Sequence, residues 1–151
     1  MPAPGTPGTS DSHAATGATA VLRETQIQLR VRYAECDPQN VAHHANYAVW
    51  LEAARTELLR EQGCAYRDLE AQGIFFVVAR MSMRFHTPAR YDDELTIAVR
   101  LAGKITGNVT VKVEHEYSVH RGDVVLATAQ TTLVCVDAAG SPRPVPEMLT
   151  R

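Results

Sequence analysis

The sequence has few cysteines, no long apolar run and almost no excess charge, and each shortage argues against a class of protein. Its three cysteines, Cys36, Cys64 and Cys135, are an odd number without metal-site spacing, which is typical of reduced thiols in a cytoplasm. No apolar run approaches the roughly 20 residues of a membrane span, and the first residues lack the basic-then-apolar pattern of a signal peptide. The formal net charge of −2 gives no sign of a nucleic-acid surface or a basic membrane patch. We therefore expect a soluble cytoplasmic protein without nucleic-acid or membrane partners.

The length and composition indicate one domain with short extensions. A chain of 151 residues that is 45% apolar can form a single core, and folding at this size hides roughly two thirds of the unfolded surface. The first residues are mainly Pro, Gly, Ser, Thr and Ala, which cannot bury enough surface to offset the entropy of ordering them. We expect a disordered leader at 1–22, a domain at 23–146 and a tail at 147–151. Three prolines after Gly140 predict that the chain there is extended.

Alternating apolar and polar residues predict five strands. The alternation extends over residues 25–33, 75–85, 95–101, 109–119 and 124–136. A different pattern lies between the first two strands, where apolar residues recur at steps of three and four. It predicts a helix from about Asn46 to Gln62, which Gly63 ends. One strand, one long helix and four further strands with short connections are typical of an α+β domain, with the helix packed on an antiparallel sheet.

A polar turn separates the first predicted strand from the helix. It carries Asp37 towards the amino end of the helix, where free N–H groups and the positive end of the helix dipole suit an anion or a polarised carbonyl oxygen. Asn46 stands just before the helical run, where its side-chain oxygen could cap the first amides. A carboxylate beside such a helix end predicts a hydrolytic centre. The turn sequence alone, however, favours a structural Asx turn at Asp37 before Pro38.

Three motifs follow one another in this stretch: Cys36-Asp37-Pro38, Ala45-Asn46-Tyr47 and Trp50-Leu51-Glu52-Ala53-Ala54-Arg55. They resemble the first half of hotdog-fold acyl-CoA thioesterases of the 4-hydroxybenzoyl-CoA thioesterase family, including its broad acyl-CoA members. Segments 85–95 and 133–137 resemble later parts of that family, so the likeness covers roughly residues 25–146. It implies a five-stranded antiparallel sheet wrapped around one long central helix. It also implies a homodimer or homotetramer that hydrolyses an acyl-CoA to a carboxylic acid and free CoA without a metal or redox cofactor.

The resemblance also implies roles for two residues of the turn. Asp37 falls where this branch of the family carries its catalytic aspartate, which would either attack the thioester carbonyl or act as a general base towards water. His44 falls where a backbone N–H receives the thioester oxygen. Its imidazole could also polarise the carbonyl, assist water or orient Asp37. We expect the neighbouring His43 and Cys36 to take no part in the chemistry.

The remaining candidates concern substrate binding. Asn46 could line the site, and Tyr47 and Trp50 are expected to line the acyl pocket. Arg90 and Lys104 are candidates for the CoA phosphates. The family carries basic residues on the hairpin between its third and fourth strands, whereas residues 104–108 contain a single lysine. This departure leaves open a thioesterase that acts on an acyl-carrier-protein. A separate alternative, from a different class of protein, is a non-hydrolytic acyl-CoA-binding module.

Overall fold

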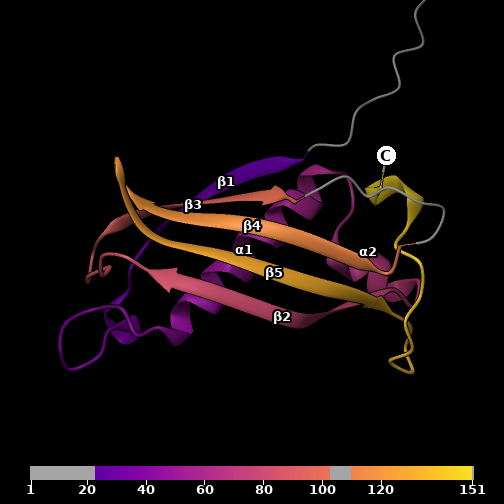
Figure 1. Cartoon of the computed structure of the whole chain (residues 1–151), viewed down its shortest axis with the longest axis horizontal. Coiled ribbons are helices and arrows are strands. Elements are labelled where there is room, and N and C mark those ends of the chain that lie inside the picture. The colour runs from indigo at the N-terminus through magenta and orange to yellow at the C-terminus, as the bar shows by residue number, and fades with distance from the viewer. Residues whose placement is uncertain (1–22, 103–109, 151) are drawn as a thin grey trace, which may run out of the picture.

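The computed structural model describes residues 23–102 and 110–150, which form one antiparallel sheet and one long helix (Figure 1). Residues 1–22, which are the whole of the expected leader, and Lys104 lie outside this part of the chain. The elements in chain order are β1 (Glu24–Arg30), α1 (Ala45–Glu61), α2 (Tyr66–Ala71), β2 (Phe75–Phe85), β3 (Glu94–Leu101), β4 (Lys112–Arg121) and β5 (Val124–Val136). Two short 3-10 turns, η1 (Tyr33–Glu35) and η2 (Glu147–Leu149), complete them. The predicted α+β architecture is confirmed.

The five strands are ordered β1-β3-β4-β5-β2, and every neighbouring pair is antiparallel. β3 alternates along its length, so that Leu95, Ile97 and Val99 face the core. β1 and β2 form the two edges of the sheet (Figure 1). β2 differs from the other strands because most of its residues are exposed, large apolar ones among them. The apolar pattern of β2 is therefore not matched by burial within this chain.

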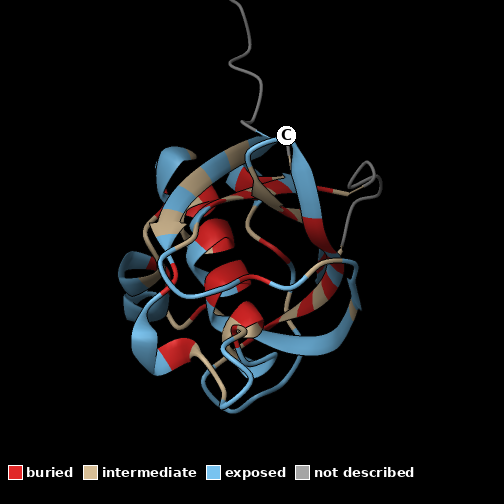
Figure 2. Ribbon diagram, turned by 90° about the vertical axis from the view of Figure 1, so that its left-hand side faces the viewer, coloured by how far each residue is buried: buried red, intermediate tan, exposed pale blue. Residues whose placement is uncertain are grey.

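Helix α1 lies against the concave face of the sheet and supplies the centre of the core. Figure 2 shows its buried turns surrounded by strands and loops. Leu51 and Ala54 are fully buried, and Leu58 nearly so. Burying a leucine side chain in this way contributes about 1.5–3 kcal/mol. The predicted helix at 46–62 agrees with the observed Ala45–Glu61, and Gly63 follows it with a φ of +82°, a conformation suited to glycine.

The chain after Gly140 is extended only as far as Pro146. The Val145 N–H donates to the Thr110 carbonyl at 2.8 Å, and η2 then buries Leu149 against the domain. The prolines exclude regular strand pairing, but they do not prevent apolar side chains from returning to the core. None of the helices in residues 23–102 and 110–150 combines the length and the apolar character needed to cross a membrane.

Candidate active site

The turn that carries Asp37 is fixed by short-range hydrogen bonds. The Asp37 N–H donates to the Val41 carbonyl at 2.9 Å, and the Asn40 N–H donates to the Asp37 carbonyl at 2.9 Å. Asn40 adopts a left-handed φ of +63°. The Asp37 Oδ1 atom accepts the Gln39 N–H at 2.8 Å, so the structural Asx turn is present. Because this bond uses Oδ1 alone, and Oδ2 has no hydrogen bond among the described residues, the carboxylate keeps one oxygen available for chemistry.

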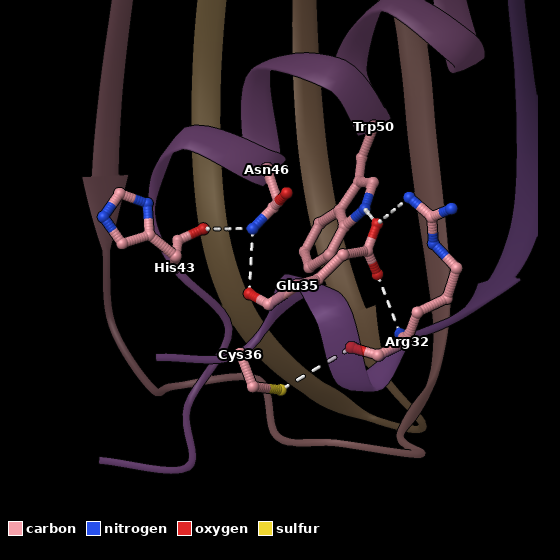
Figure 3. Close-up of polar contacts among 6 residues, drawn as sticks. All are labelled: Arg32, Glu35, Cys36, His43, Asn46 and Trp50. Carbon is pink, nitrogen blue, oxygen red and sulfur yellow. Dashed lines mark hydrogen bonds and ion pairs between the residues drawn. The ribbon is translucent and has the colours of Figure 1, made fainter. Parts of the chain in front are cut away.

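Glu35 connects the turn to the helix (Figure 3). Its side chain is only 5% exposed. The carboxylate accepts the Arg32 N–H at 2.8 Å, the Arg32 guanidinium at 3.0 Å and the Trp50 indole N–H at 3.1 Å. Burial raises the pKa of Glu35, but these hydrogen bonds from Arg32 and Trp50 outweigh burial and leave the pKa below its usual value. Glu35 is therefore an ionised anchor for Trp50.

Sequence reasoning missed this role of Glu35, although one signal was available. A tryptophan on the buried face of a helix needs an acceptor for its indole N–H. Glu35 is the buried acid of the adjoining turn, fifteen positions before Trp50. Trp50 was expected to line the acyl pocket, but the structure shows it anchored to Glu35 and packed against Tyr47, with ring centroids 4.7 Å apart.

Asn46 does not cap the helix as an acceptor. The structure places it second in α1, after Ala45, and its side-chain amide donates to the Glu35 carbonyl at 2.8 Å and to the His43 carbonyl at 3.2 Å. Figure 3 shows this amide between the two carbonyl oxygens. The capping prediction is therefore wrong. Asn46 instead holds the turn against the first turn of α1.

His43, one residue before the N-cap His44, supplies a ring acceptor for the start of the helix. Its Nδ1 atom accepts the Ala45 N–H at 3.1 Å, which requires a ring without a proton on Nδ1. The rings of His43 and His44 stack at 4.1 Å. His43 was expected to be a bystander; it takes up one of the free amides at the start of the helix.

The amides at the start of α1 leave one donor unused. A helix begins with four N–H groups that lack partners within the helix. Here the Ala45 N–H donates to His43 Nδ1, the Asn46 N–H to the His43 carbonyl and the Tyr47 N–H to the His44 carbonyl. The N–H of His44 has no hydrogen-bond partner in the part of the chain that the structure describes. It is the amide that, by the family resemblance, is expected to receive the thioester oxygen.

His44 and Tyr47 line a surface pocket of about 190 Å³ at this end of the helix. Ala42 also lines the pocket. The remaining lining residues lie at the end of β2 and in the loop after it: Phe85, His86, Thr87 and Pro88. Tyr47 is buried and meets the Phe85 ring edge to face at 5.0 Å. The pocket therefore joins the predicted oxyanion donor to the exposed edge strand.

The structure does not bring all the predicted site residues together. No hydrogen bond joins Asp37 to His44 within residues 23–102 and 110–150, and Asp37 does not line the pocket. Arg90 pairs through its backbone with Val41 of the Asp37 turn. Its guanidinium is exposed and makes no hydrogen bond or ion pair to any described residue. Arg90 is thus placed beside the site with an uncommitted positive charge.

Comparisons with known proteins give relatives over most of the chain. Residues 31–151 match the family described as the thioesterase-like superfamily. The chain is 33% identical over 122 residues to the acyl-CoA thioester hydrolase YbgC of Escherichia coli O6:H1, which covers 80% of this chain and 89% of YbgC. The crystal structure of a probable thioesterase from Bartonella henselae is similar with a TM-score of 0.75 and 32% identity, over 82% of this chain and 99% of that one.

A more distant structure has the same fold. A mutant 4-hydroxybenzoyl-CoA thioesterase, complexed with 4-hydroxybenzoyl-CoA, gives a TM-score of 0.75 over 85% of this chain and 99% of its own. At 23% identity it supports the fold alone. The predicted hotdog architecture is confirmed.

Proposed function

Because the chain belongs to the thioesterase-like superfamily of hydrolases, we propose that it hydrolyses an acyl-CoA to a carboxylic acid and free CoA at the pocket beside the start of α1. The observation that carries the proposal is the His44 N–H, which has no partner among the described residues and belongs to a residue that lines a pocket next to the Asp37 turn. The name of YbgC, an acyl-CoA thioester hydrolase, supports the choice of substrate class.

In this proposal the thioester oxygen accepts the His44 N–H. Negative charge develops on that oxygen as the tetrahedral intermediate forms, and a fixed donor with the helix dipole behind it stabilises the charge. One such donor is worth roughly 10²–10³ in rate. Asn46 and His43 act indirectly, because their hydrogen bonds fix the backbone on either side of this amide.

Asp37 supplies the second half of the chemistry through its free Oδ2 atom. As a general base it takes a proton from water, whose oxygen adds to the carbonyl to give the tetrahedral intermediate. The C–S bond breaks when this intermediate collapses, and the proton passes to the departing CoA thiolate. As a nucleophile Asp37 adds to the carbonyl itself and expels the CoA thiolate, and water then cleaves the resulting mixed anhydride to the carboxylic acid and free Asp37. Both routes need Asp37 to reach the carbonyl held at His44.

A second copy of the chain would complete the site. The pocket ends at Phe85 on β2, whose outer edge is unpaired and whose Val77 and Met81 are 48% and 40% exposed. Such an edge favours strand pairing with another chain. We expect a homodimer joined along β2, which brings elements of both chains to the pocket. Met81→Lys should weaken this dimer in light scattering after gel filtration, whereas Gln28→Lys, at an exposed position of the other edge strand, should not.

The proposal is tested by free-thiol release from a panel of acyl-CoAs. Asp37→Asn should lower kcat by about 10²–10⁴ while the fold is kept, because the asparagine oxygen can still accept the Gln39 N–H. Asp123→Asn, in the exposed turn between β4 and β5, is the matched control. Turnover that persists in both Asp37→Asn and Asp37→Ala would remove Asp37 from the mechanism. Acyl-CoA binding without turnover in the wild type would favour a binding module.

Truncated substrates separate CoA from a carrier-protein thioester. If Arg90 contacts the CoA phosphates, Arg90→Ala should raise KM for an acyl-CoA and leave the KM for the matching acyl-pantetheine unchanged. Arg67→Ala, at an exposed position on α2, serves as the control. Equal kcat/KM for acyl-CoA and acyl-pantetheine would contradict recognition of the CoA phosphates and favour a carrier-protein substrate.

A further inference from the structure

A second polar cluster lies deep in the molecule, far along α1 from the pocket. Arg55 follows Ala45 by ten positions, which is roughly 15 Å along a helix. Its side chain is only 7% exposed, and His115 of β4, which lines the same small cavity, is 8% exposed. The Nε and Nη1 atoms of Arg55 and the Nδ1 atom of His115 are buried without any hydrogen-bond partner among the described residues.

A single carboxylate balances the positive charge of Arg55, and it lies on the solvent side of the guanidinium. Its Nη2 atom contacts the Glu52 carboxylate at 3.2 Å, and that carboxylate is largely exposed to solvent. The other polar neighbours are neutral. Burial raises the pKa of Tyr66 and of Tyr117. The Arg55 cation and a hydrogen bond from its guanidinium to each phenol only partly oppose this effect, so both phenols stay protonated. The buried side of the guanidinium therefore faces no anion.

His115 is neutral as well. Burial and the nearby Arg55 cation lower the pKa of His115 to about 4. Its Nδ1 atom can then carry a proton or a lone pair, depending on the tautomer. Tyr117, which packs beside His115, shares its hydroxyl between Thr131, at 2.8 Å, and the Arg55 guanidinium, so it offers no negative charge to the cluster. A buried donor without a partner costs about 1–3 kcal/mol, so three unpaired atoms around one cavity indicate that something occupies it.

The cavity limits what that occupant can be. Its volume is about 30 Å³, and Leu58, Phe76 and Leu133 supply apolar parts of its wall. A water molecule needs at least about 10–15 Å³ measured in this way. The cavity therefore holds one or two waters, a monatomic ion or the head group of a small acid. It is too small for a phosphate ester or an acyl chain.

We propose that Arg55 and His115 form a buried binding site for a small monovalent anion, either a halide or the carboxylate of a very small acid. The anion accepts the Arg55 Nε and Nη1 hydrogens and the His115 Nδ1 hydrogen, in charge-assisted bonds that are stronger than neutral ones. It supplies the missing negative charge on the buried side of the guanidinium. This site is separate from the proposed hydrolysis and does not depend on it.

Thermal unfolding of the whole chain tests the site. Chloride or formate is titrated at constant ionic strength against gluconate, which is too large for the cavity. A bound anion should raise Tm saturably, by about 5–10 °C at a concentration 100 times its Kd. A response to chloride alone identifies a halide site, and a response that formate shares identifies a site for small carboxylates. No specific response to either ion in the wild type overturns the proposal.

Two variants and one direct measurement complete the test. Arg55→Met should abolish the response, whereas Arg60→Met, on an exposed turn of the same helix, should keep it. A response that survives in Arg55→Met contradicts the assignment. If Arg55→Met fails to fold, wild-type crystals are soaked in bromide and the anomalous density is measured. A bromide peak between Arg55 Nε and His115 Nδ1 supports the site, and water alone at that position overturns it.

Discussion

Lowering the pH from 8 to 5 should destabilise the folded chain by about 2 kcal/mol through His115 alone. The pKa of His115 is about 4 in the folded chain, against 6.5 for an ordinary histidine. Between these values the unfolded chain binds a proton at this position and the folded chain does not. Stability from His115 is therefore complete above pH 6.5 and is lost as the pH falls towards 4.

The size of the effect follows from the two pKa values. Their difference of about 2.5 corresponds to about 3 kcal/mol once the pH is well below 4. At pH 5 the unfolded chain is almost fully protonated at this position and the folded chain is about one-tenth protonated, which leaves a loss of about 2 kcal/mol. The physical cause is that an imidazolium would be buried beside the Arg55 guanidinium.

Urea unfolding at pH 8, 7, 6 and 5 measures this loss. The protein concentration is held fixed, because association would add to stability, and the buffer contains only large anions so that the proposed Arg55 site stays empty. His115→Gln removes the titration, so the difference in unfolding free energy between wild type and variant should shrink by about 2 kcal/mol from pH 8 to pH 5. His86→Gln, at an exposed position, is the control. If the difference in unfolding free energy stays constant from pH 8 to pH 5, the imidazole of His115 is not buried in its neutral form. If the difference grows as the pH falls, the pKa of His115 is raised in the folded chain rather than lowered.

Three further substitutions test the packing around the site by urea unfolding at pH 7. Glu35→Gln should cost about 1–3 kcal/mol, because Glu35 accepts at both oxygens, whereas an amide has one accepting oxygen and would turn its NH2 group towards one of these donors; an unchanged midpoint would mean that the fold does not need both acceptors. Leu51→Ala should cost about 2–5 kcal/mol through the cavity it leaves in a fully buried position, and a loss under 1 kcal/mol would show that α1 packs loosely. Gly63→Ala should cost about 1–2 kcal/mol, since φ is +82° and no neighbour lies within 4 Å of the added Cβ; no loss there would place the helix end in another conformation.

The periodic parts of the fold were predictable from the sequence, and the neighbours of each strand were not. Apolar spacing located α1 to within one residue at each end, because a helix face must meet the core at every turn. The same spacing does not say which strands pair. Short connections favoured sequential neighbours, and β3, β4 and β5 follow that rule, but β2 pairs with β5 rather than β3. The pairing of β2 with β5 leaves β2 at the edge of the sheet. The alternation of apolar and polar residues in β2 does not indicate this edge position.

The residues of the candidate site also fall into those that the sequence predicts and those that it does not. The position of Asp37 in a turn before a helix could be predicted, because the turn chemistry is local. The role of Glu35 had only an indirect signal, the need of a buried indole for an acceptor, because the indole is fifteen positions away; the role of His43 had none, because it depends on a ring turned back onto the helix. Arg55 carries no local signal at all: its burial depends on the sheet closing over α1. Long-range contacts decide these residues, and no short pattern encodes them.

The hydrogen bonding at the start of α1 also indicates which kind of ligand the helix end suits. A helix that binds phosphate presents several free amides to several oxygens. Here Glu35, His43 and Asn46 form a network that fixes the turn, and acceptors from His43 and His44 take up the amides of residues 45–47. In the part of the chain that the structure describes, the His44 N–H alone remains unpaired at this end. One fixed donor matches one developing oxyanion. The paired amides therefore argue against phosphate capture at this helix end and favour a single carbonyl oxygen as its ligand.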